Sequence, residues 1–108
     1  MRIISGKHKS RRITPPKGLP VRPTTDFAKE GLFNILNNRI SFQEIKALEL
    51  FAGTGNISFE LASRGAKEII AVDADIGCVN FIKKTSFELD MPIQTFKADV
   101  FKYLDFQN

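Results

Sequence analysis

The chain has 108 residues, 16 Lys or Arg against 12 Asp or Glu, and a formal net charge of +4, a size typical of one domain or part of one. Its single cysteine excludes an internal disulfide, and its apolar runs fall well short of the roughly 20 residues that cross a bilayer. Because the start of the chain also lacks the long apolar core of a signal peptide, we expect a soluble, cytoplasmic protein, and we assign no metal site.

The first 25 residues carry an unbalanced positive charge. They contain seven basic residues and no acid, which leaves nine basic and twelve acidic residues for the remainder. Two short extended runs, residues 2–5 and 11–14, flank a glycine-containing loop and predict a hairpin arm over residues 1–23. Since the arm has no aromatic side chain to stack on bases, it favours contact with RNA phosphates, although a merely solvated hairpin is the alternative. The candidate RNA-binding residues are Arg2, Lys7, His8, Lys9, Arg11, Arg12 and Arg22.

A helix is expected where the arm ends and a second domain, residues 24–108, begins. Thr24 or Thr25 can cap this helix, which ends near Asn38. Its apolar side is expected to consist of Phe27, Leu32, Ile35 and Leu36. Phenylalanines within periodic elements are expected in the core, namely Phe27, Phe33, Phe51, Phe59, Phe81 and Phe87.

The remaining elements predict an α/β fold. The expected strands are residues 46–52, 67–73 and 93–98, and the expected helices between them are residues 57–64 and 75–89. This alternation is typical of a parallel sheet with right-handed crossovers, that is, of a Rossmann-like fold.

Two glycines one residue apart, Gly53 and Gly55, follow the first predicted strand in the stretch ELFAGTGNI. In such sheets ligands bind at the carboxyl ends of the strands, and a side chain at either glycine would push a ligand away from the backbone. Glycine also permits the positive φ of a tight strand-to-helix turn. Asp73 and Asp99 close the second and third strands, so we expect all three strand ends to share one crevice. A carboxylate at Asp73 is placed to accept hydrogen bonds from the hydroxyls of a ribose, and Asp75 to cap the next helix.

Two cofactor classes compete for this crevice. Dinucleotides prefer a third glycine, whose place is taken here by Ser58. Glu49 lies within the motif, where its charge suits an ammonium group and disfavours a pyrophosphate. S-adenosylmethionine is therefore the favoured cofactor, and NAD is the alternative.

These motifs resemble those of class I S-adenosylmethionine-dependent methyltransferases. The stretches MRIISGKHKSRRI, VRPTTDFAKEGLFNIL and ELFAGTGNISFELASRGA are similar to the bacterial 16S ribosomal RNA (guanine-N2)-methyltransferase family. The resemblance implies methyl transfer to the exocyclic amino group of a guanine, in ribosomal RNA or an assembling small subunit. It places Arg22 and Thr24 near the mouth of the pocket. The implied cofactor-binding residues are Glu49, Phe51, Gly53, Thr54, Gly55, Asn56, Asp73, Ala74, Asp99 and Val100.

The family's fourth strand ends in a motif of the type Asn/Asp-Pro-Pro-aromatic, which this chain lacks. We therefore name no catalytic residue and expect the N-terminal, cofactor-binding half of the fold, inactive by itself. The family arrangement also implies that residues 48–52 form an open apolar edge that self-associates. A non-catalytic RNA-binding module or an NAD-binding fragment remains the alternative function.

Overall fold

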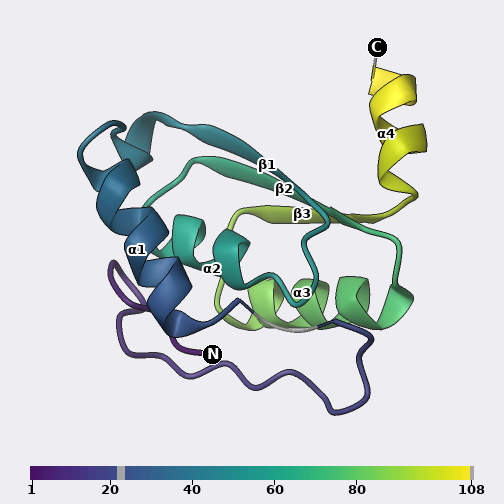
Figure 1. Cartoon of the computed structure of the whole chain (residues 1–108), viewed down its shortest axis with the longest axis horizontal. Coiled ribbons are helices and arrows are strands. Elements are labelled where there is room, and N and C mark those ends of the chain that lie inside the picture. The colour runs from purple at the N-terminus through teal and green to yellow at the C-terminus, as the bar shows by residue number, and fades with distance from the viewer. Residues whose placement is uncertain (22–23, 108) are drawn as a thin grey trace.

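The computed structural model describes residues 1–21 and 24–107, so Arg22, one of the RNA-binding candidates, lies outside the described residues. Figure 1 shows three strands beside a layer of helices, with the N-terminal arm beneath that layer. The elements in chain order are α1 (Asp26–Asn37), the 3-10 turn η1 (Phe42–Glu44), β1 (Lys46–Leu50), α2 (Asn56–Ser63), β2 (Glu68–Asp73), α3 (Ile76–Glu88), β3 (Ile93–Lys97) and α4 (Val100–Gln107).

The sheet is parallel with strand order β1-β2-β3, which confirms the predicted α/β class. Because consecutive strands are neighbours, right-handed crossovers place α2 and α3 on the same face of the sheet, as Figure 1 shows. The opposite face keeps Leu48 and Phe96 partly exposed, at 48% and 43%. In the described part of the chain β1 pairs only with β2, so it is an edge strand.

α1 starts as predicted but buries a different face. The Thr25 hydroxyl accepts a hydrogen bond from the Ala28 amide at 3.1 Å, which caps the helix. The predicted apolar side is wrong for Phe27, Leu32 and Ile35, which are 89%, 41% and 57% exposed, whereas Leu36 packs against a buried cluster as expected. The buried residues of α1 are instead Lys29 and Phe33, four positions apart on one face.

The other phenylalanines divide between core and surface. Phe33 and Phe59 are buried as expected, but the core assignment is wrong for Phe51 and for Phe87, which are 65% and 88% exposed. In α3 the inner face is formed by Val79 and Ile82, so Phe87 falls on the solvent side. Helical spacing alone does not say which face meets the sheet.

The arm packs into the same core as the sheet. Arg2 and Arg12 form an antiparallel bridge, and the Ile3 amide donates to the Arg11 carbonyl at 3.0 Å. This pairing turns Ile3 and Ile13 inward, where both are buried in one cluster with residues of α2 and α3. The arm therefore shares its apolar contacts with the helix layer.

Polar contacts hold the arm against α2. The Glu60 carboxylate accepts the Ile4 amide at 2.9 Å and the Ser5 amide at 3.1 Å. Just beyond, Gly6 passes so close to Ser63 that a Cβ on Gly6 would lie 2.0 Å from the Ser63 carbonyl oxygen. Gly6 also has a φ of +92°, so glycine is needed here for both space and conformation.

Across the described residues, no helix combines the length and the apolar character that a membrane-spanning segment requires.

Candidate cofactor and RNA site

The turn between β1 and α2 has an unusual backbone. Phe51, Gly53 and Gly55 all have positive φ, at 55°, 58° and 83°. Two of these positions use glycine, but Phe51 adopts a conformation that bulky L residues avoid, and such outliers cluster at functional sites. The chain thus makes a tight bend at the carboxyl end of β1, where the sequence predicted a ligand.

The two glycines serve the turn for different reasons. At Gly55 a Cβ would lie 2.9 Å from Ile82 and 3.1 Å from Phe59, so it would strike the protein's own core. The φ of +83° at Gly55 confirms the expected positive φ, and the predicted approach of a ligand there stays a prediction. At Gly53 a Cβ would only touch the Val21 side chain, at 3.8 Å, so the positive φ is the requirement there.

Asp73 connects the glycine turn to the start of α3. One carboxylate oxygen accepts the Gly53 amide at 3.2 Å, and the other accepts the Asp75 amide at 3.1 Å. The Asp75 carboxylate in turn caps α3, since it accepts the Cys78 amide at 2.9 Å. The predicted meeting of the first two strand ends and the predicted cap are both confirmed.

Asp99 lies at the same edge of the sheet, because β3 pairs in register with β2 up to Lys97 opposite Asp73. It is exposed and accepts the Lys102 amide at 3.0 Å, so it caps α4, an element that the sequence did not predict. Val100 is buried at the first position of that helix. Ala74, which lies between Asp73 and Asp75 after the end of β2, is exposed. The assignment of these residues to the cofactor stays a prediction.

Glu49 is a half-buried carboxylate. It accepts hydrogen bonds from both the amide and the hydroxyl of Ser58, in the first turn of α2. Burial raises the pKa of Glu49 to about 7, an effect that the bonds from Ser58 oppose and the nearby charge of Asp73 reinforces. A buried carboxylate of this kind is stabilised by a cationic partner.

Glu49 and the turn line a cavity of about 300 Å³. Thr24 borders it, as expected for a residue at the pocket mouth. The lining residues are Val21, Thr24, Glu49, Phe51, Ala52, Gly53, Thr54, Asn56 and Ile57. Five of the predicted cofactor residues therefore surround one space.

The side chain of Asn56 has partners within the protein. Its amide nitrogen donates to the Thr24 carbonyl at 2.8 Å, and its oxygen accepts from the Lys29 ammonium at 2.8 Å. Thr54 is buried, with its hydroxyl 3.9 Å from the sulfur of Met1. Sequence reasoning missed Lys29, which no local pattern distinguishes from a surface lysine.

The RNA-binding candidates of the arm fall into two groups. Arg11 and Arg12 line a second cavity, while Lys7 and Lys9 are exposed on the hairpin loop. Arg2 is only 3.9 Å from the Asp26 carboxylate, which offsets part of its charge. The pKa of His8 is lowered by burial and then by neighbouring cations, so His8 is mostly uncharged at neutral pH.

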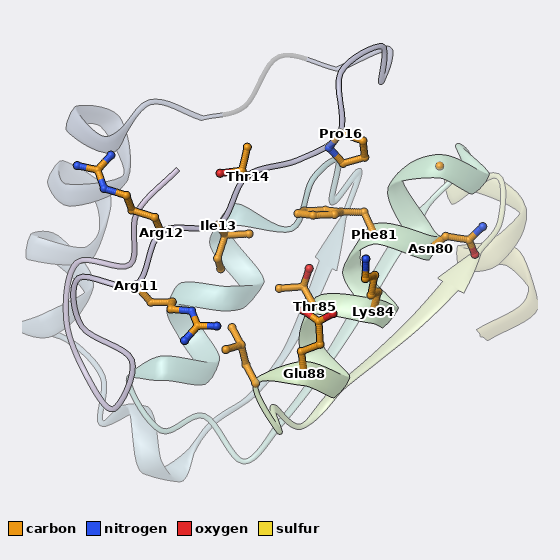
Figure 2. Close-up of a pocket in the computed structure, with 12 residues that line it drawn as sticks. Arg11, Arg12, Ile13, Thr14, Pro16, Asn80, Phe81, Lys84, Thr85 and Glu88 are labelled. Carbon is orange, nitrogen blue, oxygen red and sulfur yellow. The ribbon is translucent and has the colours of Figure 1, made fainter.

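The second cavity lies between the arm and α3 and has a volume of about 500 Å³ (Figure 2). It is lined by Arg11, Arg12, Ile13, Thr14 and Pro16 of the arm and by Gly77, Asn80, Phe81, Lys84, Thr85, Glu88 and Leu89. The α3 residues of this set were not predicted as site residues, because only the folded structure brings them beside the arm.

Comparison with known proteins gives matches along the whole chain. The family described as Conserved hypothetical protein 95 matches residues 1–108. The rRNA methyltransferase candidate YlbH of Bacillus subtilis is 37% identical over 101 residues, 92% of this chain and 54% of that protein. Ribosomal RNA small subunit methyltransferase D of Buchnera aphidicola is 30% identical over 105 residues, 96% of this chain and 53% of that protein. The chain spans about half the length of these relatives.

Solved structures share the fold. The methyltransferase candidate yhhF of Escherichia coli superimposes with a TM-score of 0.82 and 27% identity, over 96% of this chain and 55% of that one. A 16S rRNA N2 G1207 methyltransferase of Thermus thermophilus, in complex with AdoMet and guanosine, superimposes with a TM-score of 0.63 and 27% identity, over 77% of this chain and 23% of that one. The resemblance read from the sequence is confirmed.

Proposed function

Because the chain belongs to the family described as Conserved hypothetical protein 95, we propose that it is the cofactor-binding part of an S-adenosylmethionine-dependent methyltransferase. The proposed substrate is the exocyclic amino group of a guanine in small-subunit ribosomal RNA. The observation that carries the cofactor assignment is the hydrogen bond between the Gly53 amide and Asp73, with Glu49 on the adjoining strand. This arrangement places the Gly53 bend and the carboxylates of Asp73 and Glu49 at the same edge of the sheet.

The residues present fit S-adenosylmethionine. Each Asp73 oxygen accepts one backbone amide, which leaves further lone pairs for the two hydroxyls of a ribose. Glu49 would hold the methionine ammonium, since a cation lowers the free energy of a buried carboxylate. When bound, the cofactor supplies an electrophilic methyl group on its sulfonium. Phe51, Asn56, Ala74, Asp99 and Val100 complete the proposed site.

A dinucleotide fits less well, because of a contact in the first turn of α2. A pyrophosphate binds to the unpaired amides at a helix N-terminus. Here the Ser58 amide already donates to the Glu49 carboxylate at 3.1 Å. The position that would receive a phosphate is thus filled by the protein's own negative charge, which favours the methyl donor over NAD.

The RNA part of the proposal rests on the arm and on the relatives. Within residues 1–23 the basic side chains have no acid beside them in sequence, and ribosomal RNA is named as the substrate of the relatives. The guanine amino group is proposed from the resemblance and from the neighbour solved with guanosine. The arm, residues 1–23, would contact RNA, and residues 24–108 would bind the cofactor. The proposal includes a cytoplasmic location.

Calorimetric titration of the chain with S-adenosylhomocysteine, S-adenosylmethionine and NAD tests the cofactor assignment. We expect the first two ligands to bind and NAD not to bind. If only NAD binds, the chain is a dinucleotide-binding fragment and the cofactor assignment is wrong. If none of the three ligands binds, a non-catalytic RNA-binding module is the function that remains. We expect no methyl transfer to ribosomal RNA by the chain alone, as the motif that orients the amine is not in its sequence.

A further inference from the structure

We propose that the cavity between the arm and α3 binds one unpaired nucleotide of the RNA. The inference rests on the proposed RNA substrate and adds a binding site to it. The cavity of about 500 Å³ falls within the range of small-ligand pockets. Its two walls come from distant parts of the chain, the arm and the helix that follows the β2 end (Figure 2).

The inner part of the cavity is apolar and contains one aromatic ring. Ile13 and Leu89 are buried to 6% and 8% exposure, and Phe81 is half-buried. The Phe81 ring packs edge-on against Phe59, with the ring centroids 6.3 Å apart. That contact fixes the ring while Phe81 still lines the cavity. A held ring beside a cavity is a suitable surface for a base, since every base has a face that stacks on aromatic side chains.

The rim of the cavity is mostly cationic. Arg11, Arg12 and Lys84 line it, and none of the three is within ion-pair distance of an acid in the part of the chain described. Glu88 is the one acid in the lining. Figure 2 shows the Arg12 side chain directed away from α3, so Arg11 and Lys84 are the cations that face the one carboxylate. This excess of positive charge favours a phosphate, and Glu88 and Asn80 offer acceptors for the amino group of a base. An apolar floor with a ring and a cationic rim matches a single-stranded nucleotide.

The position of the cavity connects it to the proposed cofactor site. It extends along α3 from Gly77, four residues after Asp73, to Leu89 near the helix end. RNA bound there would run along α3 toward the sheet edge that carries Glu49 and Asp73. The nucleotide in the cavity would therefore belong to the same RNA strand that reaches the proposed cofactor site.

Two neighbouring lysines of α3 provide a matched test of the phosphate contact. Lys84 lines the cavity, whereas Lys83 is also exposed on the same helix but borders a different hollow. Binding of a fluorescent single-stranded oligonucleotide to the chain is measured by anisotropy over a range of salt concentrations. We expect Lys84→Ala to weaken binding and to reduce the slope of log K against log salt by about 0.7, the value for one phosphate of a single strand. Lys83→Ala should change neither quantity.

A second pair of variants tests the stacking contact. Phe81→Leu should weaken binding of the oligonucleotide about fivefold or more, whereas Phe87→Leu, on the exposed side of α3, should not. Because Phe81 also touches Phe59, thermal unfolding of both variants is recorded first. The unchanged chain should bind an abasic oligonucleotide more weakly than the normal one. The Phe81→Leu variant should bind the abasic and the normal oligonucleotide with the same affinity.

The outcomes separate this inference from the proposed function. If the unchanged chain binds RNA but Lys84→Ala and Phe81→Leu bind like their controls, the cavity is not a nucleotide site and the RNA substrate stands. If the unchanged chain binds no RNA and an acidic peptide binds instead in a Lys84-dependent way, both the nucleotide site and the RNA substrate are wrong. Binding of RNA without binding of S-adenosylmethionine would overturn only the cofactor assignment.

Discussion

The Lys29 ammonium lies 3.2 Å from the Glu60 carboxylate, and neither side chain is exposed to solvent. Lys29 also donates to the Arg2 carbonyl and to Asn56, at 2.5 and 2.8 Å. Glu60 accepts from two arm amides and from the Arg64 guanidinium at 2.8 Å. Every charge of this buried group is thus paired, and the group joins the arm, α1 and the start of α2, which lines the proposed cofactor cavity.

Lys29→Met should destabilise the fold by about 3 kcal/mol, because it removes one of the two cations beside buried Glu60 and the donor to the Arg2 carbonyl and Asn56, while the Arg64 pair remains. The free energy of unfolding is measured by urea titration. The matched control is Lys46→Met, which breaks a pair with Glu68 in which the lysine is 74% exposed. That variant should cost about 1 kcal/mol at most. Equal losses for the two variants would show that the buried group contributes no more than a surface pair.

The affinity for S-adenosylmethionine should rise with pH. Burial raises the pKa of Glu49 to about 7, so the carboxyl is mostly protonated at pH 6 and mostly ionised at pH 8. Only the ionised form attracts the ammonium, so affinity should fall about tenfold from pH 8 to pH 6. Glu49→Gln should bind weakly at both values, with a flat profile in calorimetry. A wild-type profile that is equally flat would remove Glu49 from the cofactor site.

Asp73→Ala should abolish cofactor binding, because it removes the acceptor that joins the Gly53 amide to the start of α3. Asp75→Ala should instead retain binding and cost about 1 kcal/mol of stability through the lost cap at Cys78. Calorimetry with S-adenosylhomocysteine and urea unfolding measure the two effects. The reverse pattern would assign the ribose to Asp75.

Gly6→Ala should be strongly destabilising, since its Cβ would lie 2.0 Å from the backbone oxygen of Ser63. Gly18→Ala is the matched control: Gly18 has nearly the same φ, +90° against +92°, but no atom within 4 Å of an added Cβ. The control should cost only the conformational strain of about 1–2 kcal/mol. In urea unfolding, the loss of unfolding free energy in Gly6→Ala beyond that in Gly18→Ala measures the tight approach of the arm to α2. Equal losses in the two variants would mean that the arm moves away from α2 at little cost.

Self-association of the chain is expected through β1, which is an edge strand with Leu48 48% exposed. Light scattering should show a mass that rises with concentration. Leu48→Lys, which places a charge on that edge, should reduce the rise. A constant monomer mass over a wide concentration range would contradict the prediction.

Local signals predicted much of this architecture. The three strands, the Thr25 and Asp75 caps and the contact between Asp73 and the glycine turn all follow from short stretches of sequence. The parallel order also follows, because alternating strands and helices allow few other connections. At the site, the sequence correctly placed Asp73 beside the Gly53 turn, because both positions follow from the ends of neighbouring strands. Their roles toward a cofactor stay predictions.

The inner face of α1 was not predictable in the same way. Lys29 is buried because its partners come from Arg2, Asn56 and Glu60, which are distant in sequence. A helical pattern of apolar residues contains no information about such partners, so Phe27 was assigned to the core and Lys29 was not. The same holds for the cavity on α3, whose second wall is the arm.

The burial of Ile3 and Ile13 has a practical consequence for dissecting the protein. Deleting the first 23 residues would uncover Phe59 and Ile82, which pack in the same cluster. A truncated chain that failed to bind RNA would therefore report misfolding as readily as the loss of RNA contacts. To separate misfolding from the loss of RNA contacts, the charges at exposed positions such as Arg11 and Arg12 should be neutralised by substitution in the full-length chain.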